Sequence, residues 1–211
     1  MSNSEISKQS QSKTSEELSA GQFFVEMVKV FLLAAIIIIP IRVFLFQPFF
    51  VEGASMEPNF EDGEYLIVNE LGYKTTEAMI AGKRLFIVEP FLELSRGEPV
   101  VFESPRKKGQ YLIKRVIGLP GETIEVRQSE IHITNDEHPD GFTFDEGAYL
   151  RDSVRTTDVS AVTLGEDEYY LLGDNRMNSL DSRVFGPIGK DVIIGRVLLR
   201  AWPLSRVAWF E

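Results

Sequence analysis

The sequence predicts a mainly antiparallel β domain preceded by a single transmembrane helix. Three observations support this fold class. One segment is overwhelmingly apolar, the residues after it form short β-like runs broken by turns, and the first 20 residues carry almost no large apolar side chain. A chain of 211 residues suits one globular domain plus an appendage. We expect a disordered cytoplasmic tail at 1–22, a transmembrane anchor at 23–46 and an extracytoplasmic domain at 47–211.

The apolar segment 23–46 is long enough to cross a bilayer. Its 24 residues would extend about 36 Å as a helix, against a hydrocarbon core of about 30 Å. A buried core helix and a cleavable signal peptide are the alternatives, but a signal peptide usually has a shorter charged leader. Three lysines precede the apolar core and Arg42 follows it, a slight bias toward a cytoplasmic N-terminus.

The domain after the anchor reads as a succession of short strands. Runs rich in Val, Ile, Leu and Tyr alternate with turn residues, which is typical of antiparallel sheets. We also expect a short helix around Thr76–Ala81 and an irregular excursion from Asn135 to Asp167. The predicted strands are 64–68, 99–102, 111–117, 123–127, 131–134, 169–172 and 192–199.

Composition excludes several classes of protein. The absence of cysteine rules out thiol proteases, disulfides and cysteine-based zinc sites. The formal net charge is −10, and residues 1–42 are balanced, so the acidic excess lies in 43–211. An acidic domain without a basic stripe argues against nucleic-acid binding.

Ser55, in the sequence GASMEPNF just beyond the apolar segment, is a candidate nucleophile that needs a partner to take its proton. The chain has two histidines: His132 lies in an alternating strand and His138 in a turn. In these positions both histidines are expected to be structural or solvent-exposed, and neither is a good candidate for the base of a catalytic triad. The HExxH motif and the nucleophile elbow are absent, and two S-x-x-K matches lie in the tail and in a Pro/Lys-rich loop.

Lys114 is the alternative base. It lies in the run YLIKRVI, where Leu112, Lys114 and Val116 share one face of a strand. Burial among aliphatic side chains disfavours the charged ammonium and lowers the pKa from its usual value of about 10.4. A neutral amine could then act as a general base. Taken alone, the same lysine could instead be an edge-strand charge that deters aggregation.

A polar turn, GDNRMNSLDSR from Gly173 to Arg183, is the third element. Short Asp, Asn and Ser side chains at this density make many hydrogen bonds to nearby backbone groups. On its own the segment reads as a capped turn. Such a loop could also supply an oxygen that orients a neutral lysine.

Together these segments closely resemble bacterial type I signal peptidases, which are membrane-bound Ser-Lys endopeptidases that remove signal peptides from exported proteins. Order and spacing both agree with that family. The intervals 72–96 and 128–168 contain none of its motifs. The segments that carry the resemblance are the anchor, 55–58, 60–68, 111–121 and 173–183.

The resemblance implies a role for each matching residue. Ser55 corresponds to the nucleophile and Lys114 to the general base. The Ser55 backbone N–H would contribute to the oxyanion hole, whereas Gly53 stands where some members have a serine donor. Residues that would support the site are Ser179, which orients the lysine, the ion pair Asp181 and Arg183, and Arg115 and Asp174. The resemblance also implies shallow pockets for the substrate residues one and three positions before the cleaved bond, −1 and −3. Residues that would line these pockets are Val51, Met56, Phe60, Leu112 and Ile113.

The same resemblance implies preprotein signal peptides and the lipid bilayer as partners, with no metal and no cofactor. It places the catalytic domain outside a plasma membrane, or alternatively at a thylakoid membrane. A self-cleaving Ser-Lys repressor would need an N-terminal DNA-binding domain where this chain has its apolar segment. A membrane-anchored adaptor without catalysis would not need both Ser55 and Lys114.

Overall fold

The computed structural model describes residues 20–44, 46–80 and 83–210 of the protein. The chain separates into two units, Met1–Pro40 and Ile41–Glu211. Helix α1 (Ala20–Phe44) begins three residues before the predicted anchor, so residues 20–22 are helical rather than part of a disordered tail. The rest of that predicted tail lies outside the described residues. The window Gly21–Ile38 has a mean hydropathy of 2.0 and no buried residue, so by length and composition α1 could span a membrane.

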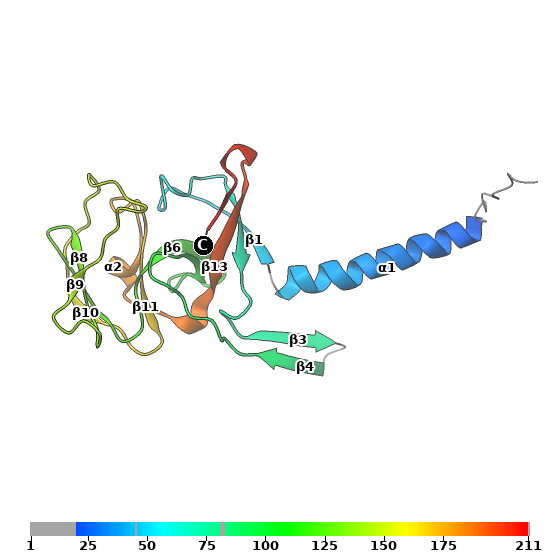
Figure 1. Cartoon of the computed structure of the whole chain (residues 1–211), viewed down its shortest axis with the longest axis horizontal. Helices are drawn as coiled ribbons and strands as arrows, with labels where there is room; N and C mark the ends of the chain where they lie inside the picture. The colour runs from blue at the N-terminus through cyan, green and yellow to red at the C-terminus, as the bar shows by residue number, and fades with distance from the viewer. Residues whose placement is uncertain (1–19, 45, 81–82, 211) are drawn as a thin grey trace, which may run out of the picture. The chain divides into compact units, whose positions relative to one another are not determined.

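The second unit is built on antiparallel strands, as the sequence predicts. Its main sheet has the order β1-β2-β13-β5-β6-β11-β12, and β14 pairs with β13 (Figure 1). Sequence neighbours β1 and β2 pair, as do β5 and β6, whereas β13 inserts between β2 and β5. The strands are β1 (Phe46–Phe50), β2 (Tyr65–Asn69), β5 (Pro99–Glu103), β6 (Tyr111–Gly118), β11 (Glu168–Leu172), β12 (Ile188–Gly189), β13 (Ile193–Trp202) and β14 (Ala208–Trp209).

A smaller sheet lies at the end of this unit away from β1 (Figure 1). Its order is β10-β7-β8-β9, so part of the stretch predicted as irregular is β-structure, because Val159–Thr163 pairs with β7. None of the residues in Val159–Thr163 is fully buried, so the segment lacks the strong apolar run that marks the other strands. The strands are β7 (Thr123–Arg127), β8 (Glu130–Thr134), β9 (Phe142–Thr143) and β10 (Val159–Thr163).

The predicted helix around Thr76–Ala81 is wrong. Residues Thr76–Ile80 form strand β3, which pairs with β4 (Lys83–Val88) in a separate hairpin. The helix propensity of Glu, Ala and Met is overridden here because the segment pairs with β4 in an antiparallel register. The remaining helices are short: α2 (Ser182–Phe185), η1 (Lys190–Val192) and η2 (Leu204–Arg206).

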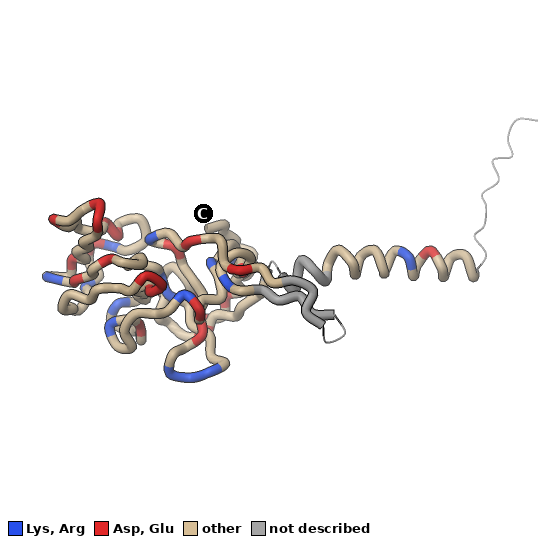
Figure 2. Tube along the Cα trace, turned by 90° about the horizontal axis from the view of Figure 1, so that it is seen from below, with Lys and Arg blue, Asp and Glu red and all other residues tan. Residues whose placement is uncertain are grey.

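Within the part of the chain that the structure describes, apolar side chains gather in three buried clusters that follow the alternation of the strands. In β8, for example, Ile131 and Ile133 are buried while Glu130 and Thr134 are exposed, the period-2 pattern of a strand with one face inward. All seven predicted strands are present, with ends shifted by at most three residues. Figure 2 shows acidic and basic residues interspersed through the unit. The cluster beneath Ser55 comprises Val51, Met56, Phe60, Leu66, Val68, Val101 and Val197.

Candidate active site

Ser55 lies on the loop that joins β1 to β2, and both ends of this loop are pinned. The N–H of Val51 donates to the carbonyl of Glu64 at 2.9 Å, and the N–H of Gly63 donates to the carbonyl of Val51 at 3.0 Å. On the inner side Met56 is fully buried in the core. The serine therefore stands on a loop whose position is set by backbone hydrogen bonds and apolar packing.

The structure brings together Ser55, from the loop after β1, and Lys114, from strand β6, although they are far apart in the sequence. The Nζ of Lys114 donates to the Oγ of Ser55 at 2.7 Å and to the carbonyl of Ile113 at 2.7 Å. Only 2% of Lys114 is exposed, and Val116 on the same face is fully buried. The burial predicted from the strand pattern is confirmed. Neither histidine contacts Ser55: the His132 ring lies beside Thr143 of the smaller sheet.

Burial lowers the pKa of Lys114 from 10.5 to about 8. The negative charges of Asp181 and Asp174 oppose this effect. Each carboxylate has its own arginine, with Arg183 Nη2 2.8 Å from Asp181 Oδ2 and Arg115 Nη2 2.6 Å from Asp174 Oδ2. The two ion pairs thus offset the charges that would otherwise hold a proton on the lysine.

The Asp181 carboxylate remains ionised although it is completely buried. Burial alone would raise its pKa, but hydrogen bonds from Arg183 and from the N–H of Gly173 lower it below the usual value, and their effect prevails. The same carboxylate caps α2 by accepting a hydrogen bond from the Arg183 N–H. One side chain therefore organises both ends of the polar turn.

The polar turn (173–183) presses directly against the backbone of the loop 51–64, here called the nucleophile loop after the role predicted for Ser55. A Cβ placed on Gly173 would lie 2.5 Å from the carbonyl oxygen of Ser55 and 2.1 Å from the Oγ of Ser179, so only glycine fits there. The N–H of Asn175 donates to the carbonyl of Ser55 at 3.0 Å, and its side-chain amide donates to the carbonyl of Ala54 at 3.0 Å. These contacts fix the position of Ser55 relative to the polar turn.

The structure does not show the expected hydrogen bond between Ser179 and Lys114. The Oγ of Ser179 is buried against Gly173, and no described group satisfies it as a hydrogen-bond partner. It faces the Asp181 carboxylate closely enough to favour the ionised form, but in a geometry short of a hydrogen bond. A buried hydroxyl with unused bonding capacity thus stands beside the site.

Next to Ser55 a cleft of about 300 Å³ opens between β1 and β6. The rings of Phe49 and Tyr111 meet edge to face across it, with centroids 5.5 Å apart. The lining is largely apolar around one acidic side chain, Glu52. The other residues that line the cleft are Phe50, Val51, Ser55, Leu66, Val101, Gly109, Gln110, Leu112, Ile113 and Lys114.

Three of the five residues expected to contact substrate, Val51, Leu112 and Ile113, line this cleft. Met56 and Phe60 do not line it; they are fully buried core residues beneath the nucleophile loop. Their apolar character signals packing, and sequence cannot separate a core face from a pocket face on a loop.

The candidate oxyanion donors differ in availability. Gly53 has a φ of +90°, and its N–H already donates to the Oδ1 of Asp62 at 2.7 Å. Within the described residues the N–H of Ser55 makes no hydrogen bond. Of the two, the Ser55 N–H is therefore the donor open to a developing oxyanion.

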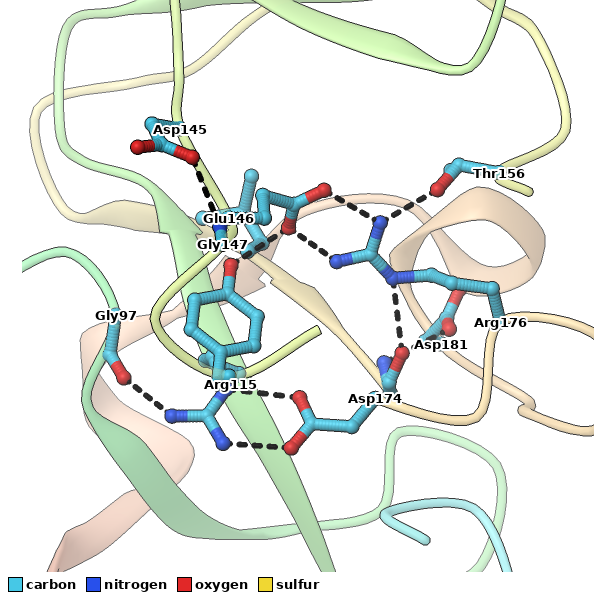
Figure 3. A network of polar contacts seen from close by, with 12 residues as sticks. Gly97, Arg115, Asp145, Glu146, Gly147, Thr156, Asp174, Arg176 and Asp181 are labelled. Carbon is cyan, nitrogen blue, oxygen red and sulfur yellow. Dashed lines mark hydrogen bonds and ion pairs between the residues drawn. The ribbon is translucent and has the colours of Figure 1, made fainter. Parts of the chain in front are cut away.

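Beyond the predicted residues, a buried polar network surrounds Asp174 and Arg115 (Figure 3). Arg176 lies inside the polar turn, where the density of polar residues could have drawn attention to it. Glu146 and Tyr149 come from the excursion, and no sequence motif marked them. The network residues missed by sequence reasoning are Asn59, Glu146, Tyr149, Thr156, Asn175 and Arg176.

Comparison with known proteins supplies the family. The model of the family described as signal peptidase, peptidase S26, matches residues 24–202. The chain belongs to the signal peptidase family. Signal peptidase I P of Bacillus subtilis subsp. natto is 32% identical over 186 residues, which cover 87% of this chain and 91% of that protein.

Two further relatives belong to the same family. Signal peptidase IB of Staphylococcus aureus is 30% identical over 182 residues, which cover 82% of this chain and 86% of that protein. The crystal structure of a signal peptidase I from Enterococcus faecalis is 31% identical and covers 50% of this chain and 97% of its own, with a TM-score of 0.41. Family membership identifies this signal peptidase as a serine endopeptidase, and its apolar α1 fits a membrane-anchored protein.

The buried amine should lower the stability of this signal peptidase, so Lys114→Met should raise its thermal unfolding midpoint at pH 7. The pKa of Lys114 is about 8 in the fold against 10.5 ordinarily, so the unfolded chain binds the proton more tightly. The destabilisation is full below pH 8 and vanishes above about 10.5. The gain in Lys114→Met should therefore shrink between pH 8 and pH 10.5, as measured by calorimetry in detergent.

Lys107→Met, at an exposed turn, is the matched control and should show no such pH-dependent gain. An equal gain in Lys114→Met at pH 7 and pH 10.5, or a lower midpoint at pH 7, would contradict the destabilising role of the amine.

Proposed function

We propose that the protein is a membrane-bound signal peptidase that cleaves N-terminal signal peptides from exported preproteins, with Ser55 as nucleophile and Lys114 as general base. The observation that carries the proposal is the 2.7 Å contact between the Ser55 hydroxyl and a buried lysine amine. A serine becomes nucleophilic when an adjacent base takes its proton, and a lysine serves once its pKa is lowered.

The reaction follows from this pair. Neutral Lys114 accepts the proton of Ser55 while Oγ attacks the peptide carbonyl, and the Ser55 N–H stabilises the oxyanion that forms. Protonated Lys114 then gives the proton to the leaving amine, which departs as the new N-terminus of the mature protein. Water, with Lys114 again as base, hydrolyses the acyl-enzyme and restores Ser55.

The cleft suits an extended peptide. Among the described residues, strand β1 pairs only with β2, and β11 pairs with β6 only at residues 115–118. Both β1 and the Tyr111–Lys114 half of β6 therefore have an edge that no described strand pairs with. A substrate strand between these edges would gain backbone hydrogen bonds. Its alternate side chains, positions −1 and −3, would point the same way into a cleft of about 300 Å³. This geometry favours small residues, as in an Ala-x-Ala site.

The chain arrangement completes the proposal. Residues 1–22 contain the cytoplasmic segment, 23–46 the membrane anchor and 47–211 the extracytoplasmic peptidase domain. Ser55 lies only 11 positions after Phe44, the last residue of α1. These span at most about 40 Å when fully extended, so the chain itself holds the nucleophile near the membrane surface where a signal peptide emerges. A plasma membrane is the proposed location.

The supporting residues have distinct proposed roles. Arg183 and Arg115 neutralise Asp181 and Asp174, and the Ser179 hydroxyl orients the amine of Lys114 once substrate fills the cleft. The unused hydrogen-bonding capacity of Ser179 Oγ supports that assignment.

Ser55→Ala and Lys114→Ala should each abolish cleavage of a preprotein with an Ala-x-Ala site, because one lacks the attacking atom and the other the proton acceptor. Product formation by the detergent-solubilised chain is followed on gels, and circular dichroism checks that both variants are folded. Ser153→Ala, at an exposed position, serves as the control. Wild-type rates in either dyad variant would rule out the pair.

Activity should rise with pH through the ionisation of Lys114. With a pKa of about 8, the neutral fraction grows about tenfold between pH 7 and pH 9. The value of kcat/KM should increase by a similar factor, measured with one peptide substrate across pH 6–10. A flat profile over this range, in protein that stays folded, would contradict a lysine base.

Ser179→Ala should lower kcat by about tenfold, less than the loss in Ser55→Ala, because the amine remains but is less well oriented. Steady-state kinetics on the same peptide give the comparison. Ser182→Ala is the control from the same turn: its Oγ accepts a hydrogen bond from the Leu171 N–H and has no proposed role toward the amine. An unchanged kcat in Ser179→Ala would remove its orienting role.

A further inference from the structure

The polar turn is held from one side by the nucleophile loop and from the other by the excursion, here residues 135–167. The excursion contains no family motif, yet Glu146 from this segment enters the polar network beside the site (Figure 3). Tyr149 joins the same network through its hydroxyl and its ring. Neither residue lines the cleft next to Ser55. Their contacts run instead to the two arginines that hold the turn and strand β6.

Glu146 makes a two-pronged ion pair with Arg176 of the polar turn. One carboxylate oxygen accepts from Arg176 Nη1 at 2.8 Å and the other accepts from Nη2. Thr156, also in the excursion, accepts from Nη1 at 2.5 Å. The arginine side chain is 1% exposed, so its charge is compensated by the excursion rather than by water. A paired, bidentate geometry of this kind fixes orientation as well as charge.

Arg176 passes this restraint to the residues next to Ser55. Its Nε donates to the carbonyl of Gly173 at 3.0 Å, and its own carbonyl accepts from Arg183 Nη2 at 2.8 Å. Gly173 is the residue packed against the carbonyl of Ser55. A shift of the Arg176 guanidinium would therefore move the part of the turn that contacts the nucleophile loop.

Tyr149 supports the second arginine. The Cζ of Arg115 lies 4.0 Å from the centre of the Tyr149 ring while the guanidinium pairs with Asp174. The tyrosine hydroxyl donates to Glu146 at 2.6 Å, which joins the two halves of the network. Asn59 of the nucleophile loop donates to both the Tyr149 carbonyl and Asp174, each at 2.8 Å. Stacking over an aromatic face fixes the plane of a guanidinium.

We propose that Glu146 and Tyr149 are positioning residues that brace the polar turn and thereby hold Ser55 and Lys114 in reacting geometry. The proposal rests on the proposed function, because it concerns the rate of the same reaction. It assigns the excursion a part in catalysis at a distance from the substrate. Because neither residue touches the cleft, the brace acts on kcat and leaves KM unchanged.

The test uses full-length protein in detergent and one Ala-x-Ala peptide, with kcat and KM measured for Glu146→Gln, Tyr149→Leu and Tyr149→Phe. Glu146→Gln should lower kcat about tenfold at constant KM, because small displacements of reacting groups reduce rates by such factors. Tyr149→Leu should do the same, since it loses the ring over Arg115. Tyr149→Phe keeps that ring and should retain at least about half of kcat.

Glu98→Gln is the matched control. The Glu98 side chain is 11% exposed against 14% for Glu146, and it pairs with Arg196 at 2.8 Å without touching the polar turn. The control should lower the thermal unfolding midpoint as Glu146→Gln does but leave kcat unchanged. That pattern separates positioning from general loss of stability.

The outcomes are distinct. Cleavage by wild type that is lost in Ser55→Ala establishes the proposed function independently of the brace, and no cleavage by wild type refutes it. The brace is overturned if Glu146→Gln keeps wild-type kcat, if Glu98→Gln loses as much, or if KM rises while kcat holds. If Glu146→Gln fails to fold, the two Tyr149 variants test the proposal instead. Equal kcat values for Tyr149→Leu and Tyr149→Phe would overturn it.

Discussion

The structure depends on placing a lysine amine in an apolar interior within 2.7 Å of a serine hydroxyl. Holding the pKa of Lys114 at about 8 rather than 10.5 corresponds to about 3 kcal/mol. That is a large fraction of the stability of a typical domain. The packing of β5, β6 and the nucleophile loop must supply this energy, and so the proposed base, Lys114, depends directly on the hydrophobic core around it.

A buried amine with a lowered pKa also constrains its surroundings. Two carboxylates, Asp174 and Asp181, lie close enough to raise the pKa of Lys114. Asp181 accepts a hydrogen bond from the Gly173 N–H, and Asp174 accepts from Arg115 and Asn59. Pairing each with an arginine keeps their hydrogen bonds while offsetting their charge. The arginines in turn require partners in the excursion and in the turn itself. The polar network thus balances the charges around Lys114, whose amine lies in an apolar interior.

Much of this arrangement is visible in the sequence. The period-2 alternation of YLIKRVI predicts that Lys114 is buried, and short runs of β-branched residues predict the strands, because both patterns are local. The pairing of Glu146 with Arg176 could not be predicted, since it joins an irregular segment to a turn 30 positions away. The helix predicted at Thr76–Ala81 fails for a similar reason: its strand partner, not its own propensity, decides its conformation. Met56 and Phe60 could equally have faced a pocket or the core.

The contact between Gly173 and the nucleophile loop has an evolutionary consequence. The junction there is made largely of main-chain atoms: the carbonyl of Ser55, the N–H of Asn175 and the bare Cα of Gly173. Ala54 contributes its carbonyl, which accepts from the Asn175 side-chain amide, so its methyl group can change without disturbing this contact. Added bulk at Gly173 would force the two backbones apart. We therefore expect position 173 to accept no residue other than glycine, because any side chain there would move Ser55 away from the polar turn.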